Sequence, residues 1–434
     1  MTTVIIIFAL SCISMIALVL LKPSVIIHGK AVNIYWAAPL IGALLMMIFG
    51  CISPGEVFSG LTADTEINPI KILILFFSMT FISIYLDEAG FFRMAASLVL
   101  KKASSSQKML FILLYITVSV LTMFTSNDII VLTFTPFICY FAKNADIDPI
   151  PYLFCEFIAA NTWSMALIIG NPTNIYLATG AGISFIEYTA VMLLPTALAG
   201  IASFGTLWLL FSKKLSKPMS RSSASEKLSN KPAAILAGIH LSLCIIALVL
   251  SSYINAPMWI ISLIFALSLI ICTIIMNIIR KKGSRVIFVS LIRIPFELIP
   301  FIISMFVLVL SLEKTGALAT VASLISGNGA IIKFGIASLI MANIVNNIPM
   351  SVMFSSITAA ISGTAEYTGA LYASVIGSNI GAFLTPIGAL AGIMWIGLLR
   401  SRGINMSFGK FTKYGSVIAV FSLAAALLGL YIVI

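Results

Sequence analysis

The chain has 434 residues, of which 61% are hydrophobic and 9% are charged, and its formal net charge is +11. A soluble domain must cover its surface with far more charge, so this composition excludes a soluble enzyme or binding domain. The basic residues lie in short loops between long apolar stretches. This is the positive-inside pattern of a membrane protein, and we expect no nucleic-acid partner.

The first half of the chain predicts five crossings of the bilayer and one re-entrant hairpin. Apolar stretches of about 20 residues are long enough to cross the hydrocarbon core. We expect crossings at 4–21, 34–52, 69–86, 151–181 and 188–211, with a short interfacial connector at 91–99. The arms 109–124 and 129–141 are short for a crossing once the polar break at 125–128 is excluded, so they predict the hairpin. The fourth crossing is interrupted at 170–174 and is predicted to be a discontinuous helix.

The second half repeats this plan after a basic, serine-rich linker at 212–231. Crossings are expected at 233–250, 257–279, 295–312, 371–398 and 415–432, and hairpin arms at 331–345 and 350–361. An odd number of crossings places the second half, 232–434, upside down relative to the first, 1–211. The loop charges agree with this inversion and predict both termini outside. We therefore predict an all-α polytopic membrane protein of two inverted repeats, with discontinuous helices meeting at the midplane.

The four interruptions are rich in proline, asparagine and threonine. A break frees backbone polar groups, which are costly in lipid unless protein, water or a ligand satisfies them. A single proline kink is most often structural, but four interruptions in corresponding positions favour a binding site. The predicted helix-break residues are Pro172, Pro349 and Pro386. The predicted substrate- or ion-binding residues are Ser126, Asn127, Asp128, Asn171, Thr173, Asn174, Asn346, Asn347, Ser378, Asn379 and Thr385.

One carboxylate, Asp128, is predicted at a hairpin tip. An acid inside the membrane is expensive, so it is a functional candidate by default, and it could bind H+ or Na+. The alternative is an N-cap for the second hairpin arm. Glu156 and Glu297 lie near basic loops and are predicted to be interfacial. No cofactor is predicted, and the six cysteines show no metal-binding or disulfide spacing and are expected to pack as small apolar residues.

Several motifs resemble the arsenite-efflux permease family of the ion transporter superfamily, which also holds sodium/proton antiporters and di- and tricarboxylate carriers. The resemblance covers nearly the whole chain and rests on the segments Leu86–Phe92 (LDEAGFF), Ser126-Asn127-Asp128, Val345–Pro349 (VNNIP) and Ala373–Gly397. It implies a scaffold domain (1–103 and 232–326) and a mobile transport domain of hairpins and broken helices (109–211 and 330–434). It also implies a homodimer formed through the scaffold.

This chain departs from the arsenite pumps at four places. Their pattern has aspartate where this chain has Asn161 and Asn379, and a lysine near Phe383, whereas the segment 170–174 is closer to the sodium/proton and carboxylate branches. Fewer acids leave fewer sites for protons or cations. The substrate prediction therefore keeps three options, namely arsenite or antimonite efflux as the leading one, sodium/proton exchange, and carboxylate transport.

The functional prediction is a secondary active transporter in the plasma (inner) membrane of a bacterium or archaeon. Its expected partners are the bilayer and a small inorganic ion or small anion. The chain has no nucleotide-binding motif, so ATP-driven pumping would need a separate ATPase subunit. A membrane-embedded enzyme would need convergent histidines, cysteines or paired acids, and neither histidine lies near a break. A passive channel fits the same broken helices and stays open as an alternative.

Overall fold

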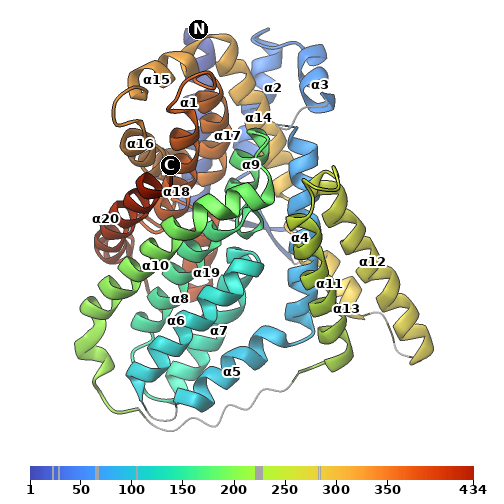
Figure 1. The fold of residues 1–434 in the computed structure, drawn as a ribbon, viewed down its shortest axis with the longest axis vertical. Coiled ribbons are helices and arrows are strands. Elements are labelled where there is room, and N and C mark those ends of the chain that lie inside the picture. Colours follow the sequence, from blue (N-terminus) through green and yellow to red (C-terminus); the bar gives the residue numbers. More distant parts are fainter. Residues whose placement is uncertain are drawn as a thin grey trace.

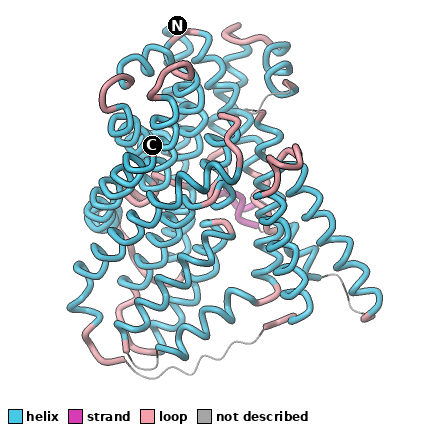
Figure 2. The backbone as a smooth tube through the Cα atoms, viewed as in Figure 1, coloured by secondary structure: helices cyan, strands magenta, loops and turns pink. Residues whose placement is uncertain are grey.

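The computed structural model describes residues 1–21, 24–27, 30–63, 68–103, 106–219, 228–281, 283 and 285–434. Helices make up almost all of it, joined by short loops (Figures 1 and 2). The helices of the first half are α1 (Thr2–Leu21), α2 (Ala37–Ile48), α3 (Pro54–Thr62), α4 (Pro69–Glu88), α5 (Phe91–Ala103), α6 (Gln107–Phe124), α7 (Asn127–Asn144), α8 (Ile150–Trp163), α9 (Pro172–Gly180) and α10 (Phe185–Leu215).

The second half consists of helices in the same order. They are α11 (Lys231–Val249), α12 (Met258–Ile279), α13 (Arg285–Ile292), α14 (Leu298–Lys314), α15 (Ala317–Ile325), α16 (Ala330–Val345), α17 (Asn347–Ala359), α18 (Tyr367–Gly381), α19 (Leu390–Ser401) and α20 (Phe408–Val433). The two strands described, β1 (Ser24–Ile27) and β2 (Lys30–Asn33), pair antiparallel with Ser24 opposite Asn33. Hydrophobic periodicity did not predict this strand pair.

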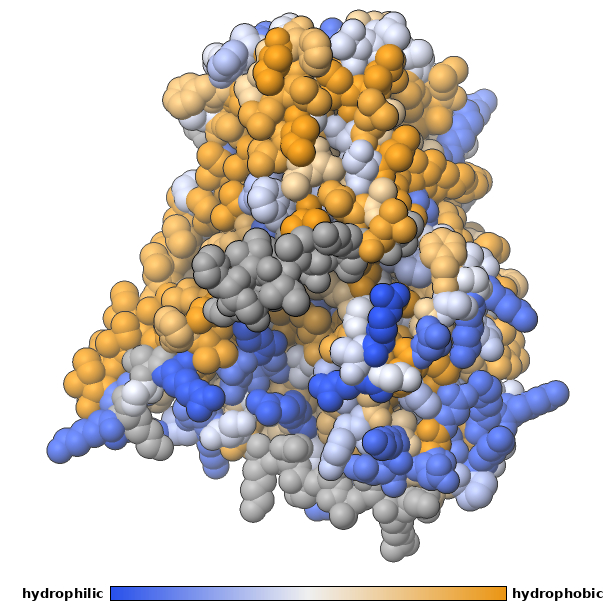
Figure 3. Space-filling view, turned by 180° about the vertical axis from the view of Figure 1, so that it is seen from behind, coloured by the Kyte–Doolittle hydropathy of each residue, from blue (hydrophilic) through white to orange (hydrophobic). Residues whose placement is uncertain are grey.

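The predicted all-α membrane fold is confirmed. Within the described chain, α1, α4, α6, α10, α11, α12 and α20 are each long and apolar enough to cross a membrane. Another candidate span is α14 with α15, bent by 80° at their junction. Apolar side chains cover the upper part of the face in Figure 3, and hydrophilic ones gather over its lower part. A soluble protein would not expose such an apolar surface.

Burial separates the central helices from the outer ones. In the apolar segment of α4, 78% of the residues are buried inside the protein. In that of α12 only 28% are buried, and large apolar side chains are exposed. Helix ends are capped by short polar residues. Asn68 accepts hydrogen bonds from the first backbone N–H groups of α4, and Ser53 forms a capping box with Glu56 at the start of α3. These two caps define the residues at which α4 and α3 begin.

Arg293 holds one junction together at the hydrophilic end of α4. It forms ion pairs with Asp87, at 2.8 Å, and with Glu88. The backbone N–H of Asn230 donates to the carbonyl of Ala89 in the same corner. The LDEAGFF motif thus ties α4 to the segments that precede α14 and α11, a role the sequence did not specify.

Two hairpins and two broken helices form a compact group. Hairpin 1 (α6 and α7) and broken helix 1 (α8 and α9) belong to the first half, while hairpin 2 (α16 and α17) and broken helix 2 (α18 and α19) belong to the second. In Figure 1, α6 and α7 lie in the lower half of the molecule and α16 and α17 in the upper half. Extensive contacts join α16 to α18 and α10 to α20. The inverted-repeat orientation, the domain boundaries and the two-domain movement stay predictions.

Several boundaries differ from the expectations. The first hairpin arm, α6, is 18 residues long and meets the requirement for a crossing, so the expectation that it is too short was wrong. The second arms begin directly at Asn127 and Asn347. Pro349 therefore lies inside the first turn of α17, where a proline loses no helical hydrogen bond, and the break itself falls at Asn346. Residues 220–227 of the expected linker lie outside the described residues.

Candidate functional site

Broken helix 1 is interrupted after Trp163, where α8 ends, and resumes at Pro172, where α9 begins. Two short 3-10 turns, Ser164–Ala166 and Ile168–Gly170, fill the gap. Asn171 caps α9 by accepting a hydrogen bond from the backbone N–H of Thr173, at 3.2 Å. Pro172 occupies the first helical position, where its fixed φ favours the helix and its missing N–H costs nothing. The break is therefore encoded locally by an Asn-Pro pair.

Broken helix 2 is interrupted between Gly381 and Leu390, and Asn343 of α16 fixes the interruption. The Asn343 Nδ2 donates to the carbonyl of Gly381 at 3.0 Å. Its Oδ1 accepts from the backbone N–H of Thr385 at 3.1 Å and from the Thr385 hydroxyl at 2.6 Å. One amide thus satisfies three polar groups released by the break, so Thr385 is held by hairpin 2. Pro386 lies in the same interruption, as predicted.

An asparagine cluster, formed by Asn171, Asn174 and Asn379, joins the two broken helices. The Asn379 Nδ2 donates to Asn174 Oδ1 at 2.7 Å, and its Oδ1 accepts from Asn171 Nδ2 at 2.9 Å. The same Oδ1 accepts from the Ser164 hydroxyl at 3.1 Å, and Nδ2 also donates to the carbonyl of Val375. Asn379 is fully buried. Both its donors and both its acceptor positions are satisfied, which fixes the crossing point of the two halves.

The tip of hairpin 1 is attached to broken helix 1. Asn127 Nδ2 donates to Asn161 Oδ1 at 3.1 Å, and Asn161 Nδ2 donates to the carbonyl of Phe157. Asn127, Ser126 and Asn161 are all buried. The Ser164 hydroxyl lies within hydrogen-bond distance of both the carbonyl of Asn161 and Asn379 Oδ1 and can donate to either, so it links this tip to the asparagine cluster.

The tip of hairpin 2 is attached to broken helix 2 in a corresponding way. Asn346 has φ +77°, a conformation that asparagine adopts more readily than other side-chain-bearing residues. Its Nδ2 donates to the carbonyl of Ile387 at 3.0 Å. The backbone N–H of Asn347 donates to the carbonyl of Gly388 at 3.1 Å. The strained turn is thus held by the very interruption that it faces.

The site leaves several buried polar atoms without a hydrogen-bond partner among the described residues. They are Ser126 Oγ, Asn127 Oδ1, Thr173 Oγ1, Asn347 Oδ1 and Ser378 Oγ. An unpaired buried polar atom costs about 1–3 kcal/mol, so such a group is a favourable place for a ligand to bind. Asn127 and Asn347 occupy corresponding positions, each beginning the second arm of its hairpin. The atoms are neutral acceptors and hydroxyls.

The electrostatics of the site come mainly from helix ends. The helices α7, α9, α17 and α19 all begin at the hairpin tips or helix breaks, so their N-termini bring partial positive charge there. The gathered residues include no lysine, arginine or histidine. The site therefore offers dipoles, amides and hydroxyls instead of full positive charges.

Asp128 lies in the first turn of α7 and is half-buried. The N-cap position belongs to Ser126, so the alternative role of Asp128 as the helix cap was wrong. Within the described chain its carboxylate has no ion-pair partner, but it interacts electrostatically with Tyr35. The Tyr35 hydroxyl is buried without a hydrogen-bond partner, and the ring shares a small cavity with Asn346. Tyr35 thus lies beside the tip of hairpin 2 and within electrostatic range of Asp128, a position that sequence reasoning missed.

The structure also adds residues that the sequence prediction left out of the site. Asn161, Ser164 and Asn343 carry the connections described above. Asn161 and Asn379 are each the third residue from the end of the first stretch of their broken helix, so comparison of the two halves could have found Asn161. The expectation that Glu156 is interfacial was wrong, because its side chain is fully buried between helices.

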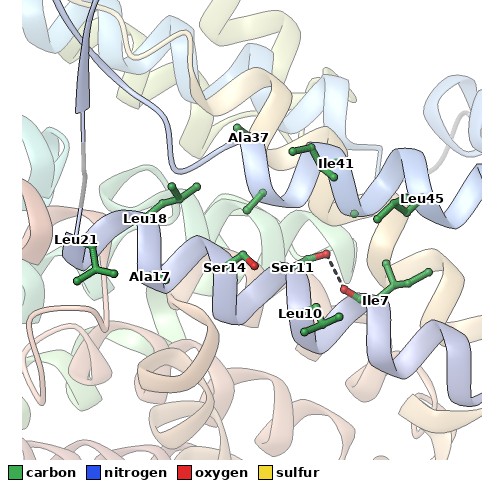
Figure 4. Close-up of a pocket in the computed structure, with 12 residues that line it drawn as sticks. Ile7, Leu10, Ser11, Ser14, Ala17, Leu18, Leu21, Ala37, Ile41 and Leu45 are labelled. Atoms are coloured by element: carbon green, nitrogen blue, oxygen red, sulfur yellow. Dashed lines mark hydrogen bonds between the residues drawn. The ribbon is translucent and has the colours of Figure 1, made fainter.

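An apolar groove between α1 and α2 lies apart from this site (Figure 4). It is lined by Ile7, Leu10, Ser11, Ser14, Ala17, Leu18, Leu21, Ala37, Ala38, Ile41, Gly42 and Leu45. The Ser11 hydroxyl already donates to the carbonyl of Ile7 at 2.7 Å. The groove is lined mainly by apolar side chains and by none of the hairpin or break residues. It therefore provides few hydrogen-bonding groups for a polar solute.

Known proteins with similar sequences identify the family to which this chain belongs. The sequence pattern of the citrate transporter family matches residues 15–377. The chain belongs to this family. It is 25% identical to the arsenical pump membrane protein of Escherichia coli (strain K12), over 91% of this chain and 92% of that protein. An uncharacterized transporter of Mycobacterium tuberculosis (strain CDC 1551 / Oshkosh) is also 25% identical, over 90% and 92% of the respective chains.

The fold has a solved counterpart. The crystal structure of the Alcanivorax borkumensis YdaH transporter superposes with a TM-score of 0.53 at 12% sequence identity, and the match covers 98% of this chain and 97% of that one. The similarity extends to the fold alone. Together the family and the apolar helices show an integral membrane transporter, and they confirm the resemblance to the arsenite-efflux permeases.

Proposed function

We propose that this transporter moves a small inorganic oxyacid, with arsenite or antimonite as the leading substrate, by secondary active transport. The main evidence for this substrate is that the site lacks positive charge. Its unpaired buried atoms are amide oxygens and hydroxyls, and no lysine, arginine or histidine lies among them. Arsenous acid is uncharged at neutral pH and presents hydroxyl groups, which can donate to amide oxygens such as those of Asn127 and Asn347. The arsenical pump relatives point to the same substrate.

Coupling to an ion gradient is assigned to Asp128 in this proposal. Its position beside the Asn127 tip would let H+ or Na+ binding alter the charge next to the substrate. Hairpins and broken helices would move as one body, because hydrogen bonds connect hairpin 1 to broken helix 1, hairpin 2 to broken helix 2, and the two broken helices to each other through the asparagine cluster. Movement against the scaffold would expose the tips to each side of the membrane in turn. Dimer formation through the scaffold belongs to the same proposal.

Carboxylate transport is the second candidate, and the family name and the four helix N-termini favour it. A di- or tricarboxylate carries several full negative charges, however, and desolvating them without a lysine or arginine is costly. Sodium ions would have to supply that charge at the amide oxygens and Asp128. Carboxylate uptake should then require sodium, whereas uncharged arsenous acid should not need a counter-ion for binding.

The test is transport by the purified full-length protein in liposomes under imposed proton or sodium gradients. We expect gradient-dependent transport of arsenite and antimonite by the wild type. Asn127→Ala and Asn347→Ala should both lower it, because each deletes one acceptor at a tip. Asn277→Ala, in the scaffold helix α12, is the matched control. Sodium-dependent citrate or succinate uptake without arsenite transport would replace this proposal with the carboxylate one.

A further inference from the structure

A second buried carboxylate, Glu156, lies away from the hairpin tips. It belongs to α8, and its side chain is fully buried. The Thr135 hydroxyl of α7 lies 3.1 Å from each carboxylate oxygen and can donate to either. Asn161 is five residues further along α8, a rise of about 7.5 Å, so Glu156 lies one to two turns from the hydrogen-bonded tip of hairpin 1.

Aromatic rings make the surroundings of Glu156 apolar. Trp395 of α19 packs against Phe157, at 4.9 Å between ring centroids, and against Phe154 at 5.8 Å. Phe411 of α20 closes the same group at 5.7 Å from Trp395. The indole N–H of Trp395 is buried, lacks an acceptor at normal hydrogen-bond geometry and interacts with the Glu156 carboxyl group. A donor from the second half of the chain is thus available to an acid of the first half.

No positive charge compensates Glu156 within the described chain, since none of the ion pairs found there includes it. The titratable groups that interact with it are the thiols of Cys155 on α8 and Cys139 on α7, while the exposed Arg402 interacts with Cys139. Two hydrogen-bond donors do not offset the cost of burying an isolated carboxylate, which in practice takes up a proton instead.

We propose that Glu156 is a proton-binding site of the transport cycle, with Thr135 and Trp395 as positioning residues. The inference rests on the proposed transport function and adds a coupling site to it. In this conformation one carboxylate oxygen holds the proton. When the body of hairpins and broken helices moves against the scaffold and water reaches Glu156, the O–H bond breaks, the proton passes to water, and the carboxylate stays behind hydrated. Reversal of these steps on the other side of the membrane completes proton exchange.

Glu156→Gln mimics the protonated acid and keeps an acceptor for the Thr135 hydroxyl, so it separates proton binding from folding. In proteoliposomes it should abolish substrate movement driven by a pH gradient, while substrate-for-substrate exchange at equal pH continues. Glu187→Gln, an exposed acid in the first turn of α10, is the matched control and should behave as the wild type. Gradient-driven transport by Glu156→Gln at the wild-type rate would overturn the inference while leaving the transport proposal intact.

Infrared spectroscopy tests proton binding without any substrate. The wild type should show the C=O stretching band of a protonated carboxylic acid, which shifts in D2O and is missing in Glu156→Gln but present in Glu187→Gln. Identical bands in all three proteins would mean that Glu156 holds no proton, and the inference fails. A wild type that shows the band but moves neither arsenite nor antimonite would overturn the substrate proposal alone. If Glu156→Gln does not fold, Glu156→Asp, whose band should shift, gives the same decision.

Discussion

Replacing Asn379 by leucine tests whether the asparagine cluster holds the two halves together. Leucine has a similar shape but neither donors nor acceptors. Within the described chain, Asn174 Oδ1 and Asn171 Nδ2 would each lose their one partner, whereas Ser164 keeps the carbonyl of Asn161 and Val375 keeps its helical hydrogen bond. Two buried polar atoms at about 1–3 kcal/mol each predict a loss of about 2–6 kcal/mol in the free energy of unfolding.

The neighbouring residue supplies the control for this prediction. Ser378 is also fully buried, but its hydroxyl has no hydrogen-bond partner in the described structure, so Ser378→Ala orphans nothing. We expect this variant to be at least as stable as the wild type, because the substitution removes a buried hydroxyl that has no partner. Unfolding in detergent, followed by heat and by denaturant, compares both variants with the wild type. If Asn379→Leu proves as stable as Ser378→Ala, the cluster does not hold the halves together and the reasoning is refuted.

Three further predictions concern backbone shape, helix packing and pH. Asn346→Ala should destabilise more than Asn346→Gly, because φ +77° strains alanine by about 1–3 kcal/mol while glycine adopts it freely; equal melting temperatures would contradict this. Gly377→Ala should destabilise strongly, since its Cβ would overlap atoms of α16, whereas Gly397→Ala has open space and should melt as the wild type. Hydrogen bonds from Lys314 and Ser53 lower the pKa of the exposed Glu56 from 4.5 to about 2. A lowered folded-state pKa adds stability that is fully present above pH 4.5 and is lost as the pH falls to about 2. The wild type should therefore exceed Glu56→Gln in stability by a constant amount above pH 4.5, and acid titration should remove that difference between pH 4.5 and about 2.

Much of the architecture follows from local chemistry. Apolar length predicts crossings because lipid cannot satisfy backbone groups, and Asn171-Pro172 marks a helix start wherever it occurs. The interruptions of the helices and the polar residues at them were therefore accessible from the sequence, whereas the role of those residues in binding stays a prediction. Pro349 does not itself break the helix, because a proline in the first turn fits an α-helix. The left-handed backbone of Asn346 makes the turn between the two arms.

Tertiary structure alone decided which polar residues meet and which charges are buried. The sequence places Glu156 near a basic loop, but α7, α8 and α19 close around it and leave it dry. Tyr35 follows a strand pair that the hydrophobic pattern of the sequence did not predict. The fold brings it beside the tip of hairpin 2 and within electrostatic range of Asp128. The local sequence was enough to locate most helices and the regions where they break, because capping residues, prolines and apolar runs act on their neighbours along the chain. Burial and pairing depend on residues more than 200 positions apart, such as Asn171 and Asn379, so only the packed helices could settle them.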